Sequence, residues 1–107
     1  MRTISTTLAL MLLAASAASW AADAAAGKAV YDRTCKSCHG PDGAPVAAVA
    51  KMMKVEIRDL RSKEVQASSD AELRKIITEG KGKMTAVKSV TGAAIDDVVA
   101  HTRTLKK

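Results

Sequence analysis

The chain has 107 residues, enough for one small domain, and its 17 Lys and Arg residues against 11 Asp and Glu give a net charge of +6. It contains no Phe, one Trp and one Tyr, so its own side chains offer little material for a large apolar core. The positive charge favours acidic partners, whereas nucleic acid is disfavoured because no binding motif or interleaved aromatic residue accompanies the charge.

Residues 1–21 have the pattern of a secretory signal peptide. Arg2 supplies a positive charge, an apolar stretch follows, and Ser19 and Ala21 place small side chains at the two positions that a signal peptidase inspects. An uncleaved membrane anchor is the alternative, but the stretch is well short of the ~20 apolar residues that span a bilayer. We therefore expect cleavage after Ala21, a domain over residues 22–107 and a periplasmic location.

An alanine-rich stretch at residues 22–31 predicts a helix that leads into the pattern Cys35-Lys36-Ser37-Cys38-His39. Two thiols at this spacing, followed at once by a histidine, are typical of a c-type haem attachment. A thioredoxin-like site, half of a zinc site and a plain disulfide are the alternatives. No βαβ context supports the first, and only His101 remains as a further ligand for the second. The motif predicts covalent haem.

Glycine and proline residues between positions 40 and 45 break the helix, so the motif is expected where a helix meets a loop. The next segment, residues 46–62, has weak helical spacing and allows one short helix. Ser69 followed by Glu72 fits a capping box, the apolar face after it indicates a helix, and Gly80 is a typical helix end.

Residues 80–85 are expected to form a loop that contains Met84, and residues 93–105 a last helix with a core-facing apolar stripe. No strand pattern of any length appears. The sequence therefore predicts a small all-α domain with long connections. Such connections are uncommon in a small domain unless they wrap a prosthetic group.

The order and spacing of residues along nearly the whole domain carry a family resemblance. The matching positions are Gly27, Tyr31, residues 35–43, 69–73, 77–84 and 103–105. With them the chain resembles a class I cytochrome c of the short bacterial monohaem type. The resemblance implies thioethers at Cys35 and Cys38, His39 as proximal iron ligand and Met84 as distal ligand.

The same resemblance implies that the N- and C-terminal helices cross, with Gly27 permitting their close approach. It also makes the Pro45 carbonyl a possible acceptor for the second ring nitrogen of His39. The chain departs from the family at Thr85, where most relatives have proline, and at His101, where relatives usually have an aromatic residue. It also lacks the second aromatic residue with which many relatives shield the haem propionates.

The residues themselves favour the same distal ligand. Met84 lies on a glycine-flanked loop that can bring a thioether to the iron. Met52 and Met53 fall in a segment that could be helical, where methionine is mostly packing, so we expect core or lid residues there. His101 borders the apolar stripe of the last helix, which favours a packing role over a ligand role.

A His/Met-ligated haem has no open position for substrate, so the resemblance implies a monomeric one-electron carrier and not an enzyme. Lys81, Lys83 and Lys88 surround Met84 and are expected to meet a partner's acidic docking face. Two alternatives stay open. The chain could be a haem subunit of a larger dehydrogenase or oxidase, or a ligand-binding sensor or enzyme in which Met84 dissociates.

Overall fold

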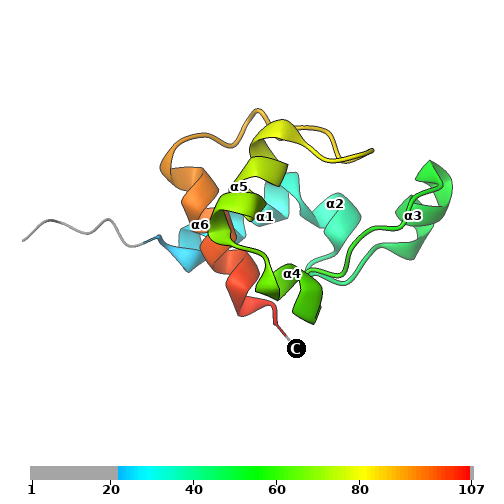
Figure 1. Cartoon of the computed structure of the whole chain (residues 1–107), viewed down its shortest axis with the longest axis horizontal. Coiled ribbons are helices and arrows are strands. Elements are labelled where there is room, and N and C mark those ends of the chain that lie inside the picture. The colour runs from blue at the N-terminus through cyan, green and yellow to red at the C-terminus, as the bar shows by residue number, and fades with distance from the viewer. Residues whose placement is uncertain (1–21, 107) are drawn as a thin grey trace, which may run out of the picture.

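A computed structural model describes residues 22–106, and the described chain is built from short helices (Figure 1). Their bounds are α1 (Ala24–Thr34), α2 (Lys36–His39), α3 (Ala47–Met53), α4 (Lys63–Ala67), α5 (Asp70–Glu79) and α6 (Ala93–Thr104). The all-α prediction is confirmed for this part of the chain. The predicted signal peptide lies outside the described residues, so the division at Ala21 stays a prediction.

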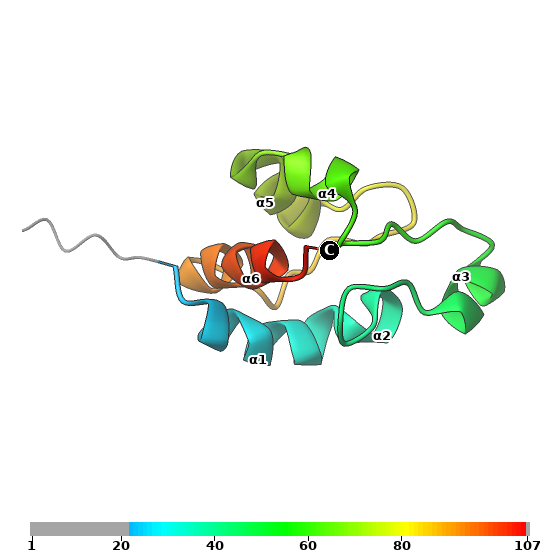
Figure 2. The same ribbon diagram turned by 90° about the horizontal axis from the view of Figure 1, so that it is seen from below.

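The first and last helices, α1 and α6, pack against each other, as Figure 2 shows. Asp23 caps α1 by accepting from the backbone N–H groups of Ala25 and Ala26, and its own N–H donates to Asp97 Oδ1 at 2.8 Å. A Cβ placed on Gly27 would lie 1.9 Å from the Asp97 carbonyl oxygen. Only glycine fits there, which confirms that Gly27 permits the close contact of the two helices.

Helix α5 begins and ends as its sequence predicts. The Ser69 hydroxyl accepts from the Glu72 N–H at 3.1 Å, and Gly80 follows the last turn with a φ of 78°, in the region that favours glycine. Its buried side chain, Ile77, packs with Val90, Val98 and Val99 in the core between α5 and α6. The segment between α5 and α6 carries Met84.

Helix α4 is not predicted by the sequence pattern. Ser62 caps it through a 3.2 Å bond from the Val65 N–H. Long-range bonds tie it to α6: Gln66 Nε2 donates to the Thr102 carbonyl, and the Arg103 guanidinium donates to the Gln66 and Ser68 carbonyls and to Asp70 Oδ1. Five residues give too short an apolar pattern to stand out in sequence.

Helix α3 stands away from the other helices in both views (Figures 1 and 2). It is the short helix predicted within residues 46–62, and it ends at Lys54, which has a left-handed φ of 54°. Met52 is 75% exposed on it, which excludes the core role for this residue and leaves the lid role as a prediction. The chain returns beside the haem motif, where the Leu60 N–H donates to the Gly43 carbonyl.

Candidate functional site

A cavity of about 570 Å³ opens between α2, α5, α6 and the segments that lead back from α3 and on from α5. Its volume falls within the roughly 300–1,000 Å³ typical of cofactor and ligand sites. The walls are mostly aliphatic, with Val55, Ile57, Leu60, Val65, Leu73, Ile76, Ile77 and Val98 among them. The four predicted site residues Cys35, Cys38, His39 and Met84 all line this one cavity.

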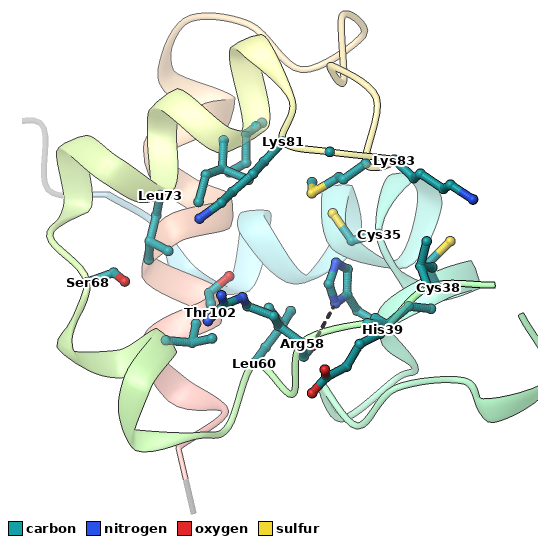
Figure 3. Close-up of a pocket in the computed structure, with 18 of the residues that line it drawn as sticks. Cys35, Cys38, His39, Arg58, Leu60, Ser68, Leu73, Lys81, Lys83 and Thr102 are labelled. Atoms are coloured by element: carbon teal, nitrogen blue, oxygen red, sulfur yellow. Dashed lines mark hydrogen bonds between the residues drawn. The ribbon is translucent and has the colours of Figure 1, made fainter. Parts of the chain in front are cut away.

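The cysteines reach the cavity because α1 ends just before them and α2 gives a single further turn. Figure 3 shows the side chains of Cys35, Cys38 and His39 on the same wall. Both cysteines carry free thiols. Burial raises the pKa of the Cys35 thiol, although the Thr34 hydroxyl 3.3 Å away acts in the opposite direction. Both cysteines line the cavity, so the motif presents its two sulfur atoms to one space.

Tyr31 fixes the chain just after the motif. Its ring is completely buried, and its hydroxyl donates to the Gly40 carbonyl at 2.6 Å. Burial raises the pKa of this hydroxyl well above its ordinary value, so Tyr31 stays a neutral donor. The turn that follows His39 is therefore held from the α1 side by a bond that does not depend on pH in the physiological range.

The second ring nitrogen of His39 does not bond to the Pro45 carbonyl, which was the expected acceptor. The His39 Nδ1 lies 3.3 Å from the Arg58 carbonyl oxygen (Figure 3), and this carbonyl takes the place that the resemblance suggested for Pro45. The reason is that the chain returning from α3 passes directly beside the ring. Because a carbonyl can only accept, Nδ1 carries the proton in this bond. Burial lowers the pKa of His39, which favours the neutral ring.

Met84 is placed by a tight backbone turn. The Lys81 N–H donates to the Met84 carbonyl at 2.9 Å, and the Met84 N–H donates back to the Lys81 carbonyl at 3.0 Å. Gly80 sits against this turn, where a Cβ would lie 2.5 Å from the Met84 oxygen. Lys83 Nζ donates to the Met53 carbonyl at 2.9 Å. Lys81, Lys83 and Met53 line the cavity as well, whereas Lys88 is exposed outside it.

His101 lies outside the cavity, between α6 and α1. Its ring is 7% exposed and packs on Tyr31 with ring centroids 4.9 Å apart at an angle of 59°. This agrees with the predicted packing role. Within residues 22–106, no three His, Cys, Asp or Glu side chains gather into a candidate metal site.

Comparison with known proteins decides the family. The family described as "Cytochrome C oxidase, cbb3-type, subunit III" matches residues 22–101. The chain belongs to this family of cytochromes c. Among solved structures, the cytochrome is similar to the "KustC0563 c-type cytochrome", with 30% identity and a TM-score of 0.65 over 76% of this chain and 98% of that chain. No significant match occurs among curated proteins.

The residues of the cavity fit the prosthetic group of a c-type cytochrome. With one Cys-x-x-Cys-His motif in its sequence, this is a monohaem c-type cytochrome, and the cysteine spacing implies covalent haem c. Aliphatic walls suit a flat macrocycle, and an imidazole and a thioether supply the donors that haem iron takes in cytochromes c. None of the described helices has the length and apolarity to cross a bilayer.

Two residues of the cavity wall, Arg58 and Val65, were not predicted from the sequence, and a third, Thr102, was predicted only as core-facing. The Arg58 carbonyl has no side-chain signal, because every residue has a backbone carbonyl. Val65 belongs to the unpredicted helix α4. Thr102 was expected in the core-facing stripe of the last helix, and its hydroxyl donates to the Val98 carbonyl at 2.9 Å while the residue lines the cavity. The 3.6-residue period of α6 was the available signal for Thr102.

Proposed function

We propose that this cytochrome is an exported one-electron carrier whose haem is attached at Cys35 and Cys38 and whose iron is bound by His39 and Met84. Haem supplies an iron that alternates between the ferrous and ferric states. The observation that carries the proposal is that both cysteines, the imidazole and the Met84 thioether line one cavity. Family membership supports the carrier role, since a cytochrome c domain typically carries electrons.

His39 is prepared for metal binding by its surroundings. The Arg58 carbonyl holds the proton on Nδ1, which leaves Nε2 with a free lone pair. The lowered pKa keeps that lone pair available where an ordinary histidine begins to protonate. The same carbonyl fixes the ring orientation, a role that such outer partners commonly have at metal sites.

Met84 contributes a soft thioether, which stabilises the ferrous state and raises the potential. If both His39 and Met84 bound the iron, they would leave no open position for oxygen or substrate. That supports a carrier and not an enzyme. Thr85 in place of the usual proline favours the alternative in which Met84 dissociates and external ligands bind the iron. The measurement that decides between the two is whether Met84 is bound to the iron.

The proposed partners are proteins with acidic docking faces. Lys81 and Lys83 are exposed at the mouth of the cavity, and Lys88 is exposed further along the same segment. Positive charge at this point steers an acidic surface towards the prosthetic group. Redox contacts of this kind are small and short-lived, and we expect a monomer. The family match begins at residue 22, directly after the predicted signal peptide, which supports export to the periplasm.

The second candidate is a haem subunit of a larger oxidase or dehydrogenase. The description of the matching family, a subunit of a cbb3-type oxidase, favours it. In that case the chain carries electrons by the same ligands within a permanent complex. Purification from the native host under mild conditions separates the two, because a subunit leaves the column with its enzyme and a free carrier leaves alone.

The experiment that tests the ligand set is Met84→Ala in the haem-loaded protein, with Met53→Ala as the matched control methionine of the same cavity. We expect Met84→Ala to keep its haem but become high-spin and bind carbon monoxide. Its reduction potential should be lower than that of the wild type. The loss should be on the order of 0.1 V, since axial ligands spread haem potentials over about 0.8 V. A Met84→Ala protein with the wild-type spectrum and potential contradicts the assignment.

A further inference from the structure

One hydrogen bond at the mouth of the cavity joins two segments that are 30 residues apart in sequence. Lys83 Nζ donates to the Met53 carbonyl at 2.9 Å. Met53 is the last residue of α3, so its carbonyl has no partner within the helix and is free to accept. A lysine ammonium also suits the negative end of a helix. Both residues line the cavity.

The other bonds of the Met84 segment are local. The Lys81–Met84 pair closes the turn on itself, and the Val87 N–H donates to the Ile77 carbonyl at 2.8 Å, which fastens the segment to the end of α5. These bonds hold the turn to the end of α5, directly after which the segment begins. Among the bonds described for residues 80–86, only the Lys83–Met53 bond reaches α3, the helix that projects away in Figure 1.

The residue after Met84 is Thr85, which leaves the backbone dihedrals of the segment freer than a proline ring does. A freer segment needs another restraint to keep its thioether in place. The Lys83 ammonium is in a position to provide it, since it belongs to the residue directly before Met84 and is anchored across the cavity mouth.

We propose that Lys83 is a positioning residue for Met84, whose ammonium group fastens the Met84 segment to the end of α3. This rests on the proposed ligation by Met84. The bond sets how often the thioether leaves the iron, and it makes the access of external ligands depend on the position of α3. Lys83 thereby makes a side-chain bond to a distant segment, whereas the bonds described for Lys81 are made by its backbone.

The test compares three variants of the haem-loaded protein. Lys83→Met removes the donor and keeps the length of the stem, and Lys83→Arg retains a donor. Lys75→Met removes one exposed lysine charge on α5, away from the cavity mouth. We measure the rate of carbon monoxide binding to the reduced protein and the pH at which the methionine-to-iron band of the oxidised protein disappears.

Compared with the wild type, Lys83→Met should bind carbon monoxide roughly fivefold faster, as expected when one hydrogen bond of about 1 kcal/mol is lost. It should also lose the methionine-to-iron band at a lower pH. Lys83→Arg and Lys75→Met should behave like the wild type. Equal rates in Lys83→Met and Lys75→Met overturn the proposal, and so does a Lys83→Arg protein that resembles Lys83→Met. In either case Met84→Ala still opens the iron, so failure of the ligation itself is seen separately.

Discussion

At His101 an imidazole occupies the place between α1 and α6 where related cytochromes usually have an aromatic ring. The ring packs on Tyr31, but its Nε2 has no hydrogen-bond partner within the described chain. Burial lowers the pKa of His101, Lys28 adds to the lowering, and Asp32 opposes it. A protonated imidazole is therefore disfavoured at this helix contact.

We predict that His101 makes the folded protein sensitive to mild acid. In the unfolded chain His101 binds a proton near pH 6.5, which is above its pKa in the folded protein. Above about pH 6.5 the histidine therefore takes nothing from the free energy of unfolding. That free energy falls as the pH drops below about 6.5 and levels off once the folded ring also protonates. The proposed ligation of the iron by His39 would remove that histidine from the pH dependence of the haem-loaded protein. Thermal unfolding of the haem-loaded protein at pH 7.5 and pH 5 measures the loss.

The matched variant is His101→Tyr, which keeps a ring and removes the titration. It should flatten the pH dependence and be more stable at pH 5 by about 1 kcal/mol, the typical cost of an unsatisfied buried group. That corresponds to a rise in Tm of roughly 4–8 °C for a domain of this size. An unchanged slope between pH 7.5 and 5 in His101→Tyr assigns the acid sensitivity to carboxylates instead.

Single residues of the site could be predicted where the signal is local. Cys35, Cys38 and His39 follow one another at a fixed spacing, and glycines on either side mark the segment of Met84. The partner of His39 could not be predicted, because the choice between the carbonyls of Pro45 and Arg58 depends on the path of a distant segment. The Lys83–Met53 bond could not be predicted for the same reason, because 30 residues separate its two partners.

Among the elements, the α1–α6 pair leaves the least room for change. The Asp97 carbonyl occupies the space where a Gly27 side chain would lie. We predict that Gly27→Ala destabilises the haem-loaded protein by about 3 kcal/mol, at the upper end for overpacking, because backbone has to move. The control is Ala29→Ser on the exposed side of α1, which should stay within about 0.5 kcal/mol. Denaturant unfolding compares the two, and equal midpoints contradict a tight contact.

The elements that sequence predicted have ends that can be read locally. Helix α5 has Ser69 at its start and Gly80 at its end, and the apolar period of α6 extends over three turns. Helix α4 has only five residues, and what holds it is remote: Gln66 bonds to α6, and Arg103 reaches back from α6 to the Gln66 and Ser68 carbonyls. Tertiary structure, more than propensity, stabilises such a short helix.

For the whole domain, the cavity is large relative to the core. The buried hydrophobic residues are Tyr31, Val65, Ile77, Val90, Val98 and Val99, mostly valines, which bury little area each. Three of these, Val65, Ile77 and Val98, also line the cavity, together with further aliphatic side chains of α5 and of the segment after α3. The sequence indicated this balance by its lack of aromatic residues, but the projection of α3 away from the other helices had no sequence signal.

We predict that the domain does not keep its fold without haem. In the double variant Cys35→Ala and Cys38→Ala the apolar walls have no group to pack against, and a small domain has only about 5–15 kcal/mol of stability to lose. Circular dichroism should show reduced helix content and no cooperative thermal transition. A haem-loaded wild-type sample is the control. A cooperative transition in the haem-free variant, at a temperature near that of the control, contradicts the prediction.

The position of the motif in the chain also orders the events of biogenesis. Cys35, Cys38 and His39 precede nearly every other wall of the cavity, which comes from residues 53–102. Synthesis runs from the N-terminus, so the two thiols exist before α5 and α6 have been made. We therefore expect that covalent attachment can precede completion of the binding site. The later segments can close around a group that is already fixed, and folding then becomes the last step of cofactor insertion.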